Sequence, residues 1–487
     1  MRKVLGFMGA AGALLIVHCA MAAGDSRQSS VVKIVAGCRA PDYFQPWDMN
    51  YQNTRFGSGF IVEGKRIMTN AHVVSDQVYI QVIKVGDPKK YTAKVEYMAH
   101  DCEIALLKVE DEAFFAGTKP VRFGGIPQQR DRVAAYGFPT GGEVLSITEG
   151  IVSRVEMQNY SHSQREFPAI QIDAAINAGN SGGPVFKGDE VVGISFQTYA
   201  STQNIAYIVP TPVIKRFYAD IADGNYEGAP LLGIRWKPIE SPAMRRYYGL
   251  AEKQGGILAT SVLYQSSTWG VVKDGDVVLA VAGTPIERDG TIELRKNERV
   301  NFTWLLSSRQ MGEKVDMDIL RDGAIKRVTV TLVPCRFLVP LMQYDRKPTY
   351  IVFAGFVFMP LNYNYLSRWS WNDMDPDFRI LFSDGMVTPE RRQAVIINQV
   401  LLHDINIGYQ DIARQVIGKV NGKPVGDMAE LAAALAAPVG DYHTIEIVDA
   451  FGKSRMIVLD AKKMAEANAD IMKRFSIPAD RSEDLKQ

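Results

Sequence analysis

The chain has 487 residues, of which 47% are hydrophobic and 22% are charged, and its formal net charge is +1. That length exceeds one ordinary hydrophobic core, so we expect roughly three domains. A near-neutral charge without a long basic run argues against general binding to nucleic acid or to an anionic membrane surface.

The N-terminal residues have the pattern of a secretory signal peptide. Two basic residues precede an uncharged apolar run over 4–17, and Ala20-Met21-Ala22 offers small residues for cleavage after position 22. We therefore predict a signal peptide over 1–22 and an exported protein, periplasmic or otherwise extracytoplasmic. An uncleaved anchor and lipidation at Cys19 are the alternatives, and no other segment has the length and apolar character of a membrane span.

Three cysteines remain after the signal peptide, which is an odd number for an exported protein. A bridge between Cys38 and Cys102 is one arrangement that the sequence leaves open, with Cys335 free. The six histidines are scattered without metal-ligand spacing, so we predict no metal and no cofactor. Tyr43, Phe44 and Trp47 form an aromatic cluster that fits either core packing or a contact between subunits.

From residue 56 onward the pattern changes to short apolar runs separated by turn residues. These runs predict strands over 59–62, 66–69, 78–82, 91–95, 104–109, 132–136, 143–155, 190–196 and 205–209, and a helix over 210–223. Many short strands with little helix are typical of barrels or sandwiches.

Three motifs in this region have residues suited to nucleophilic catalysis. In Gly179-Asn180-Ser181-Gly182-Gly183-Pro184, a serine between glycines can occupy a tight turn that exposes its hydroxyl and aims backbone N–H groups at one point. Asn70-Ala71-His72 supplies the base that a serine needs, and Glu103 precedes the apolar run Ile104-Ala105-Leu106-Leu107. A Gly-Ser-Gly turn alone would be weak evidence, but histidine, acid and serine in this order are a stronger signal.

These motifs resemble those of the HtrA/Deg proteases, which are PDZ-containing relatives of the chymotrypsin-like serine proteases. The match runs from Gly57 to Pro212, and the second half is most similar to the plant-and-bacterial branch with two divergent PDZ-like domains. The resemblance implies a mostly β fold in which a chymotrypsin-like double β-barrel precedes two PDZ-like α+β domains. The expected boundaries are 31–224 for the protease domain, 228–335 and 345–465 for the PDZ-like domains, and 466–487 for a tail.

The resemblance also implies roles for individual residues. Ser181 would be the nucleophile, His72 the general base and Glu103 the acid that orients it, while the backbone N–H groups of Gly179 and Ser181 would form the oxyanion hole. Ile194 and Ile205 would line a substrate pocket for small or medium aliphatic side chains, although ordinary core positions explain them equally well. The expected partners are protein or peptide substrates and further copies of the chain, as a trimer or hexamer.

The acid position departs from the family, which has aspartate where this chain has Glu103. Asp101 lies two positions earlier, and residues two apart in an extended strand point the same way, so both carboxylates could face His72. Register against the apolar run that follows favours Glu103. Asp101 and an impaired site are the alternatives.

The second half contains a weak internal repeat, in which 276–286 corresponds to 415–425. Each copy predicts a strand, a glycine turn and a second short strand, followed by a helix near 300–306 or 428–435, as in a PDZ domain. In the first copy, Leu232-Gly233-Ile234 resembles the loop that holds a peptide's terminal carboxylate. The second copy has Gly355-Phe356-Val357-Phe358 at this place and is expected to be structural or oligomer-forming.

The favoured function is therefore an exported serine endopeptidase that acts on misfolded or unassembled proteins. The alternative from another class is a catalytically weak or silent peptide-binding scaffold or chaperone, which the glutamate at the acid position motivates. A general esterase is a weaker third hypothesis, because two PDZ-like modules argue against a small-molecule substrate.

Overall fold

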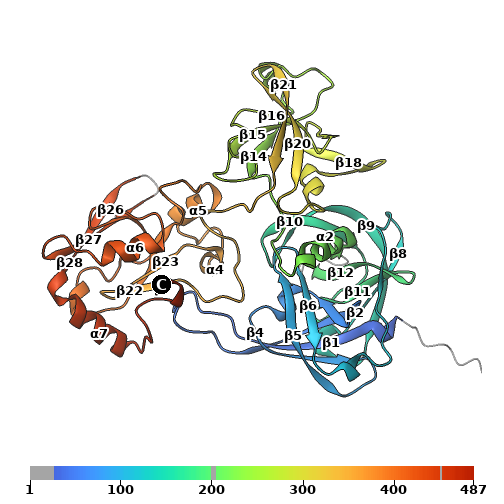
Figure 1. The fold of residues 1–487 in the computed structure, drawn as a ribbon, viewed down its shortest axis with the longest axis horizontal. Coiled ribbons are helices and arrows are strands. Elements are labelled where there is room, and N and C mark those ends of the chain that lie inside the picture. The colour runs from blue at the N-terminus through green and yellow to red at the C-terminus, as the bar shows by residue number, and fades with distance from the viewer. Residues whose placement is uncertain (1–26, 199–204, 450–451, 487) are drawn as a thin grey trace, which may run out of the picture.

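The computed structural model describes residues 27–198, 205–449 and 452–486, so the predicted signal peptide lies outside the described residues. Figure 1 shows three units: a double barrel, a small sheet unit beside it, and a mixed unit that contains the C-terminus. Across the described residues, no helix has the length and apolar character needed to cross a membrane.

The first barrel is closed by six antiparallel strands in the order β1-β2-β3-β6-β5-β4. They are β1 (Val31–Cys38), β2 (Asn53–Val62), β3 (Arg66–Thr69), β4 (Gln77–Lys84), β5 (Lys90–Ala99) and β6 (Ile104–Val109). The sequence patterns did not predict β1, which pairs with both β2 and β4 and so closes the ring. Its two faces lie in different hydrophobic cores, Val31 in one and Ile34 in the other, so the strand lacks a polar face.

The second barrel follows directly and is also antiparallel around a closed ring of six strands. Its strands are β8 (Arg132–Gly137), β9 (Ser146–Tyr160), β10 (Arg165–Ile172), β11 (Pro184–Lys187), β12 (Glu190–Thr198) and β13 (Ala206–Pro210), with β7 (Arg122–Phe123) paired to β12. Helix α2 (Thr211–Asp220) ends this unit, continued by the 3₁₀ turn Ile221–Asp223, which confirms the helix predicted over 210–223. The two rings confirm the double-barrel fold class.

The second unit is a small sheet in the order β14-β15-β16-β20-β21, with β17 paired to β16. Its elements are β14 (Ile234–Pro238), α3 (Pro242–Tyr247), β15 (Ile257–Val262), β16 (Val277–Val281), β17 (Thr284–Pro285), the hairpin β18 (Thr291–Arg295) and β19 (Glu298–Asn301), the 3₁₀ helix Phe302–Leu306, β20 (Lys314–Arg321) and β21 (Ala324–Thr331). Strand β14 lies at the edge of this sheet.

The third unit repeats the same strand-turn-strand plan with more helix. Its elements are β22 (Ile351–Phe353), β23 (Phe356–Pro360), α4 (Tyr363–Leu366), α5 (Pro376–Ser383), β24 (Val395–Val400), β25 (Gln415–Val420), β26 (Lys423–Pro424), α6 (Met428–Leu435), β27 (Tyr442–Val448), β28 (Ser454–Asp460) and α7 (Met464–Arg474). The pairings β16–β17 and β25–β26 occupy equivalent places, which confirms the internal repeat. Helix α7 packs its buried face against this unit.

The N-terminal aromatic cluster packs within the chain rather than standing free. The Phe44 ring stacks on Tyr365 of α4 with centroids 5.0 Å apart, and Trp47 meets Tyr350 edge-on. The segment after β1 therefore reaches from the first barrel to the third unit. Cys38, Cys102 and Cys335 are all free thiols, so the bridge between Cys38 and Cys102 is not formed.

Strand β1 generates a testable prediction, because Ile34 is fully buried in the core of the first barrel. Ile34→Ala should destabilise the double barrel by about 2–5 kcal/mol, since burial of the side chain is lost and a cavity remains. Native-state hydrogen exchange should show lower protection in β1, β2 and β4, with β20 and β21 unchanged. The control Val78→Ala, in β4 but 55% exposed, should have little effect. Unchanged protection in the Ile34 variant would show that β1 does not close the barrel.

Candidate active site

His72 and Glu103 lie together between the two barrels. His72 sits on the one-turn helix α1 (Ala71–Val74), directly after β3, and Glu103 sits at the turn that leads into β6. The His72 Nδ1 atom is 2.8 Å from Glu103 Oε2. The carboxylate is 1% exposed and the imidazole 34% exposed, so the acid is shielded while the ring still faces the cleft.

The carboxylate of Glu103 is the ionised partner of this pair. Burial alone would raise its pKa, but His72, the nearby His162, and hydrogen bonds from the ring and backbone of His72 lower the pKa below its ordinary value. The Asn70 amide donates to the Glu103 backbone carbonyl at 2.8 Å and fixes the turn from the other side. An ionised carboxylate on Nδ1 leaves the opposite ring nitrogen of His72 as the proton acceptor.

The expectation that Asp101 and Glu103 point the same way is wrong. Strand β5 ends at residue 99 and β6 begins at residue 104, so residues 100–103 form a turn in which the alternation of a strand does not apply. Glu103 has φ 64°, a left-handed conformation that reverses the direction of the chain. The turn aims Glu103 at His72 and sends Asp101 elsewhere.

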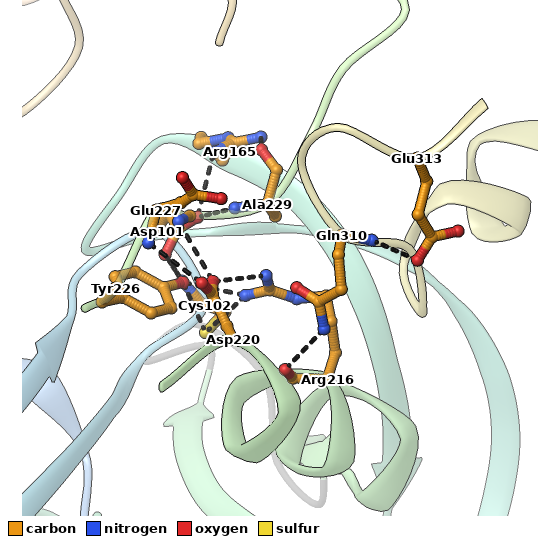
Figure 2. Close-up of polar contacts among 11 residues, drawn as sticks. Asp101, Cys102, Arg165, Arg216, Asp220, Tyr226, Glu227, Ala229, Gln310 and Glu313 are labelled. Atoms are coloured by element: carbon orange, nitrogen blue, oxygen red, sulfur yellow. Dashed lines mark hydrogen bonds and ion pairs between the residues drawn. The ribbon is translucent and has the colours of Figure 1, made fainter. Parts of the chain in front are cut away.

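Asp101 is the centre of a separate polar network, shown in Figure 2. Its carboxylate accepts from Arg165 at 3.1 Å, from the backbone N–H of Ala229 at 2.8 Å, and from the Tyr226 hydroxyl. Burial would raise the pKa of Asp101, but the guanidinium groups of Arg165 and Arg216 and these hydrogen bonds hold it below its ordinary value. Asp101 therefore ties the turn to the segment before the second unit and does not contact His72.

Ser181 lies on a turn that only glycines allow. Gly179 and Gly182 on either side have φ values of 99° and 84°. A Cβ on Gly182 would lie 2.2 Å from Ser58 O and 3.0 Å from Asn70 N, so the serine turn packs directly against the segment that carries His72. In the described part of the chain the Ser181 hydroxyl forms no hydrogen bond.

The peptide groups around Ser181 are held in one orientation. Ala178 O accepts from Thr140 N at 2.6 Å, and Asn180 O accepts from Ser195 Oγ at 2.5 Å. In a trans peptide the N–H points opposite to the C=O, so the N–H groups of Gly179 and Ser181 point away from these anchors. Among the described residues neither N–H has a partner, so both are available to donate to an oxyanion.

Ser58 is a site residue that the sequence motifs did not indicate. Its Oγ donates to Gly179 O at 2.7 Å and accepts from Phe138 N at 2.9 Å, and its N–H donates to Ser181 O at 2.8 Å. Ser58 belongs to β2 of the first barrel, whereas its partners belong to the second. The one feature of the sequence that indicates this contact is the pair of glycines in Gly57-Ser58-Gly59, since glycines within a strand mark a close approach of another backbone.

The two isoleucines expected in the substrate pocket lie in the core between the barrels. Ile194 is fully buried and Ile205 packs partly buried against the same core. A role for them in selecting the substrate stays a prediction.

The Leu232-Gly233-Ile234 loop lies beside a cavity of 170 Å³ that the third unit closes on one side. Gly385 and Met386 line the opposite wall, and Arg235 pairs with Asp384 at 3.2 Å. The equivalent place in the third unit differs, because β23 is paired on both edges and offers no free strand edge to a peptide.

Within the described residues, no cluster of three His, Cys, Asp or Glu side chains is arranged to hold a metal ion.

The site between the two six-stranded barrels combines a buried carboxylate on a histidine, a half-buried serine on a glycine turn and two anchored peptide N–H groups. This combination defines a chymotrypsin-like serine peptidase. Comparisons with known families agree with this class. The model of the trypsin-like peptidase domain matches residues 57–194, and the model of a PDZ domain matches residues 339–484.

Comparison with known proteins extends the match over almost the whole chain. Protease Do-like 2 of the chloroplast of Arabidopsis thaliana is 36% identical over 461 residues, which is 94% of this chain and 75% of the relative. The putative mitochondrial protease Do-like 3 of the same plant is 36% identical and covers 95% of this chain and 81% of the relative. The chain therefore belongs to the HtrA/Deg family of Do-like proteases and is a serine endopeptidase. Its assignment to one branch stays a prediction.

A solved structure of a variant of the HtrA-type protease AlgW, with a decapeptide, shares the fold. It overlaps 66% of this chain and 97% of its own chain, with a TM-score of 0.50 and 21% identity.

The junction made by Ser58 gives a prediction for the site. Ser58→Ala should lower kcat at least tenfold, because Gly179 O loses its anchor and the oxyanion donors are released. It should also cost about 1–3 kcal/mol of stability, because Phe138 N–H is left buried without a partner. Steady-state kinetics on a fluorogenic peptide and thermal unfolding measure the two effects. The control is Ser153→Ala in β9, where no hydroxyl hydrogen bond is lost. Equal kcat values for the two variants would contradict the role of Ser58 in anchoring the peptide group at Gly179.

Proposed function

We propose that this chain is an exported endopeptidase that cleaves misfolded or unassembled proteins with Ser181, His72 and Glu103 as its triad. The observation that carries the proposal is the 2.8 Å contact of His72 Nδ1 with the buried, ionised carboxylate of Glu103. The signal-peptide pattern supports export, and the PDZ-like units support protein substrates.

The triad would act in two steps, acylation and deacylation. His72 Nε2 takes the proton of the Ser181 hydroxyl as its oxygen attacks the scissile carbonyl, and Glu103 stabilises the imidazolium that forms. The N–H groups of Gly179 and Ser181 donate to the tetrahedral oxyanion. His72 then gives the proton to the leaving amine, and a water molecule activated by the same ring hydrolyses the acyl-enzyme.

The first PDZ-like unit would deliver substrate. Strand β14 is a free sheet edge, and the Leu232-Gly233-Ile234 loop before it would hold a terminal carboxylate through its backbone. The contact of Asp384 and Met386 with this unit supports a resting state in which the third unit covers part of the groove. Exposed apolar side chains on the first barrel, among them Phe56 and Tyr79, support assembly into a trimer or hexamer.

The alternative is a catalytically weak peptide-binding scaffold or chaperone with a protease fold. Two observations favour testing it: the acid is a glutamate, and the Ser181 hydroxyl forms no hydrogen bond with His72 among the described residues. Catalytic hydrogen bonds often tighten only when substrate binds, so neither observation decides against catalysis.

Removal of the nucleophile tests the proposed function. Ser181→Ala should abolish β-casein cleavage, by a factor on the order of a million in turnover, because related triads lose that much without the serine. Circular dichroism and size-exclusion chromatography should be unchanged, since the side chain packs little. Cleavage at the wild-type rate by the variant would refute the assignment, and absence of cleavage by both proteins would favour the scaffold.

The two candidate acids are separated by a matched pair of amide variants. Glu103→Gln should lower kcat by about 10⁴-fold, because an amide no longer holds His72 as an ionised carboxylate does. Asp101→Asn should change kcat less than tenfold, since its carboxylate contacts the linker and not the histidine. Steady-state kinetics on one peptide substrate rank the pair. The reverse ranking would assign the acid to Asp101.

A further inference from the structure

The second oxygen of the Glu103 carboxylate faces another histidine. His162 Nδ1 lies 3.7 Å from Glu103 Oε1, opposite the oxygen that contacts His72. His162 is 8% exposed and lies in the turn between β9 and β10 of the second barrel. The triad as proposed above does not use this residue.

His162 is the inner member of a chain of polar contacts that leads to the surface. Its Nε2 is 3.0 Å from His100 Nδ1, and His100 Nε2 is 2.8 Å from Asp345 Oδ2. Asp345 is held in turn by Asp76, since each backbone N–H donates to the other residue's carboxylate, at 2.6 and 2.8 Å. The chain therefore runs from the proposed catalytic acid to the segment that connects the two PDZ-like units.

Tyr344 from the same connecting segment fixes the His162 ring. The two rings stack with centroids 3.8 Å apart at an interplanar angle of 12°, and the Tyr344 hydroxyl donates to His162 O at 2.8 Å. The stack restricts the tilt of the ring and the hydrogen bond restricts its backbone. The His162 ring therefore keeps its orientation toward Glu103.

The proton arrangement follows from these partners. Burial lowers the pKa of His162 to about 3, with Glu103 opposing the shift and His72, His100 and Arg55 adding to it, so the ring is neutral and carries one N–H. When Nε2 accepts from His100, that N–H lies on Nδ1 and faces Glu103. The Asp345 carboxylate lies 2.8 Å from His100 Nε2 and holds the His100 ring beside His162.

A glutamate needs such a contact more than an aspartate does. Its side chain has one more rotatable bond, so fixing one oxygen on His72 leaves the carboxylate more ways to turn. A second partner on Oε1 restricts that rotation and keeps Oε2 on the His72 Nδ1–H. Catalytic groups lose much of their effect when their geometry relaxes by as little as about 1 Å.

We propose that His162 is a positioning residue for the catalytic acid Glu103, and that Tyr344 and Asp345 hold His162 in place. Docking of the segment between the PDZ-like units on the double barrel would then set the geometry of the triad. The proposal rests on the proposed function, because it takes Glu103 as the acid.

The first test replaces the ring without removing its bulk. In the full chain, His162→Phe keeps the stack on Tyr344 but removes both nitrogens, and we expect kcat to fall at least tenfold with KM within twofold. His162→Asn, whose amide nitrogen can take the place of Nδ1, should retain more activity than His162→Gln, whose amide reaches toward His100. Equal activity of wild type and the Phe variant, or a Gln variant above the Asn variant, would overturn the proposal.

The second test asks whether the connecting segment acts through His162. The pair Tyr344→Phe and Asp345→Asn, combined in one chain, should lower kcat several-fold, whereas the neighbouring control Lys347→Ala should not change it. The same pair should have no further effect in the His162→Phe background, because residues that act in series are not additive. Full additivity would mean that the segment acts by another route. The Tyr344–Asp345 variant in the otherwise wild-type chain and its control Lys347→Ala test the proposal even if His162→Phe fails to fold.

The design separates this proposal from the function on which it rests. If Ser181→Ala and Glu103→Gln abolish cleavage while the His162 and Tyr344–Asp345 variants match wild type, the triad stands and the positioning role is wrong. If Glu103→Gln leaves kcat unchanged, both assignments fail together.

Discussion

The hydrogen bonds of Ser58 join the two barrels at the point where their functional groups meet. His72 belongs to the first barrel and Ser181 to the second, so no local sequence rule places them together. Ser58 bonds the peptide groups at Gly179 and Ser181 from across the interface. Its hydroxyl is buried and both donates and accepts, so a loss of this side chain would leave backbone groups buried without a partner, at a free-energy cost. The relative position of His72 and Ser181 depends on this junction.

The turn over residues 100–103 links the site to the rest of the chain. Three successive side chains enter three environments: Asp101 binds the segment before the first PDZ-like unit, Cys102 packs in the core, and Glu103 meets His72. Neighbouring His100 contacts the segment between the PDZ-like units through Asp345. Both connecting segments therefore touch the turn that carries Glu103, and a movement of either PDZ-like unit has a short path to the proposed triad.

Local patterns predicted most strands of the double barrel, but they did not predict β1 or the turn over residues 100–103. Strand β5 begins with alternating exposed and buried side chains and the helix after β13 has an apolar face, so both were found. Strand β1, whose two faces are both buried, was missed, and residues 100–103 were treated as a strand because the apolar run after them is one. The left-handed backbone at Glu103 has no signature in a glutamate side chain.

The sequence by itself determined the class of protein, because the histidine and serine motifs, their order and the glycines around Ser181 are local requirements of the chemistry. It also ranked Glu103 above Asp101 by register. Only the tertiary structure decided which atoms meet: the anchoring of two peptide carbonyls by Thr140 and Ser195, and the approach of His162 to the acid. These contacts join residues distant in the chain, and their geometry depends on how barrels and connecting segments pack, which no local pattern encodes.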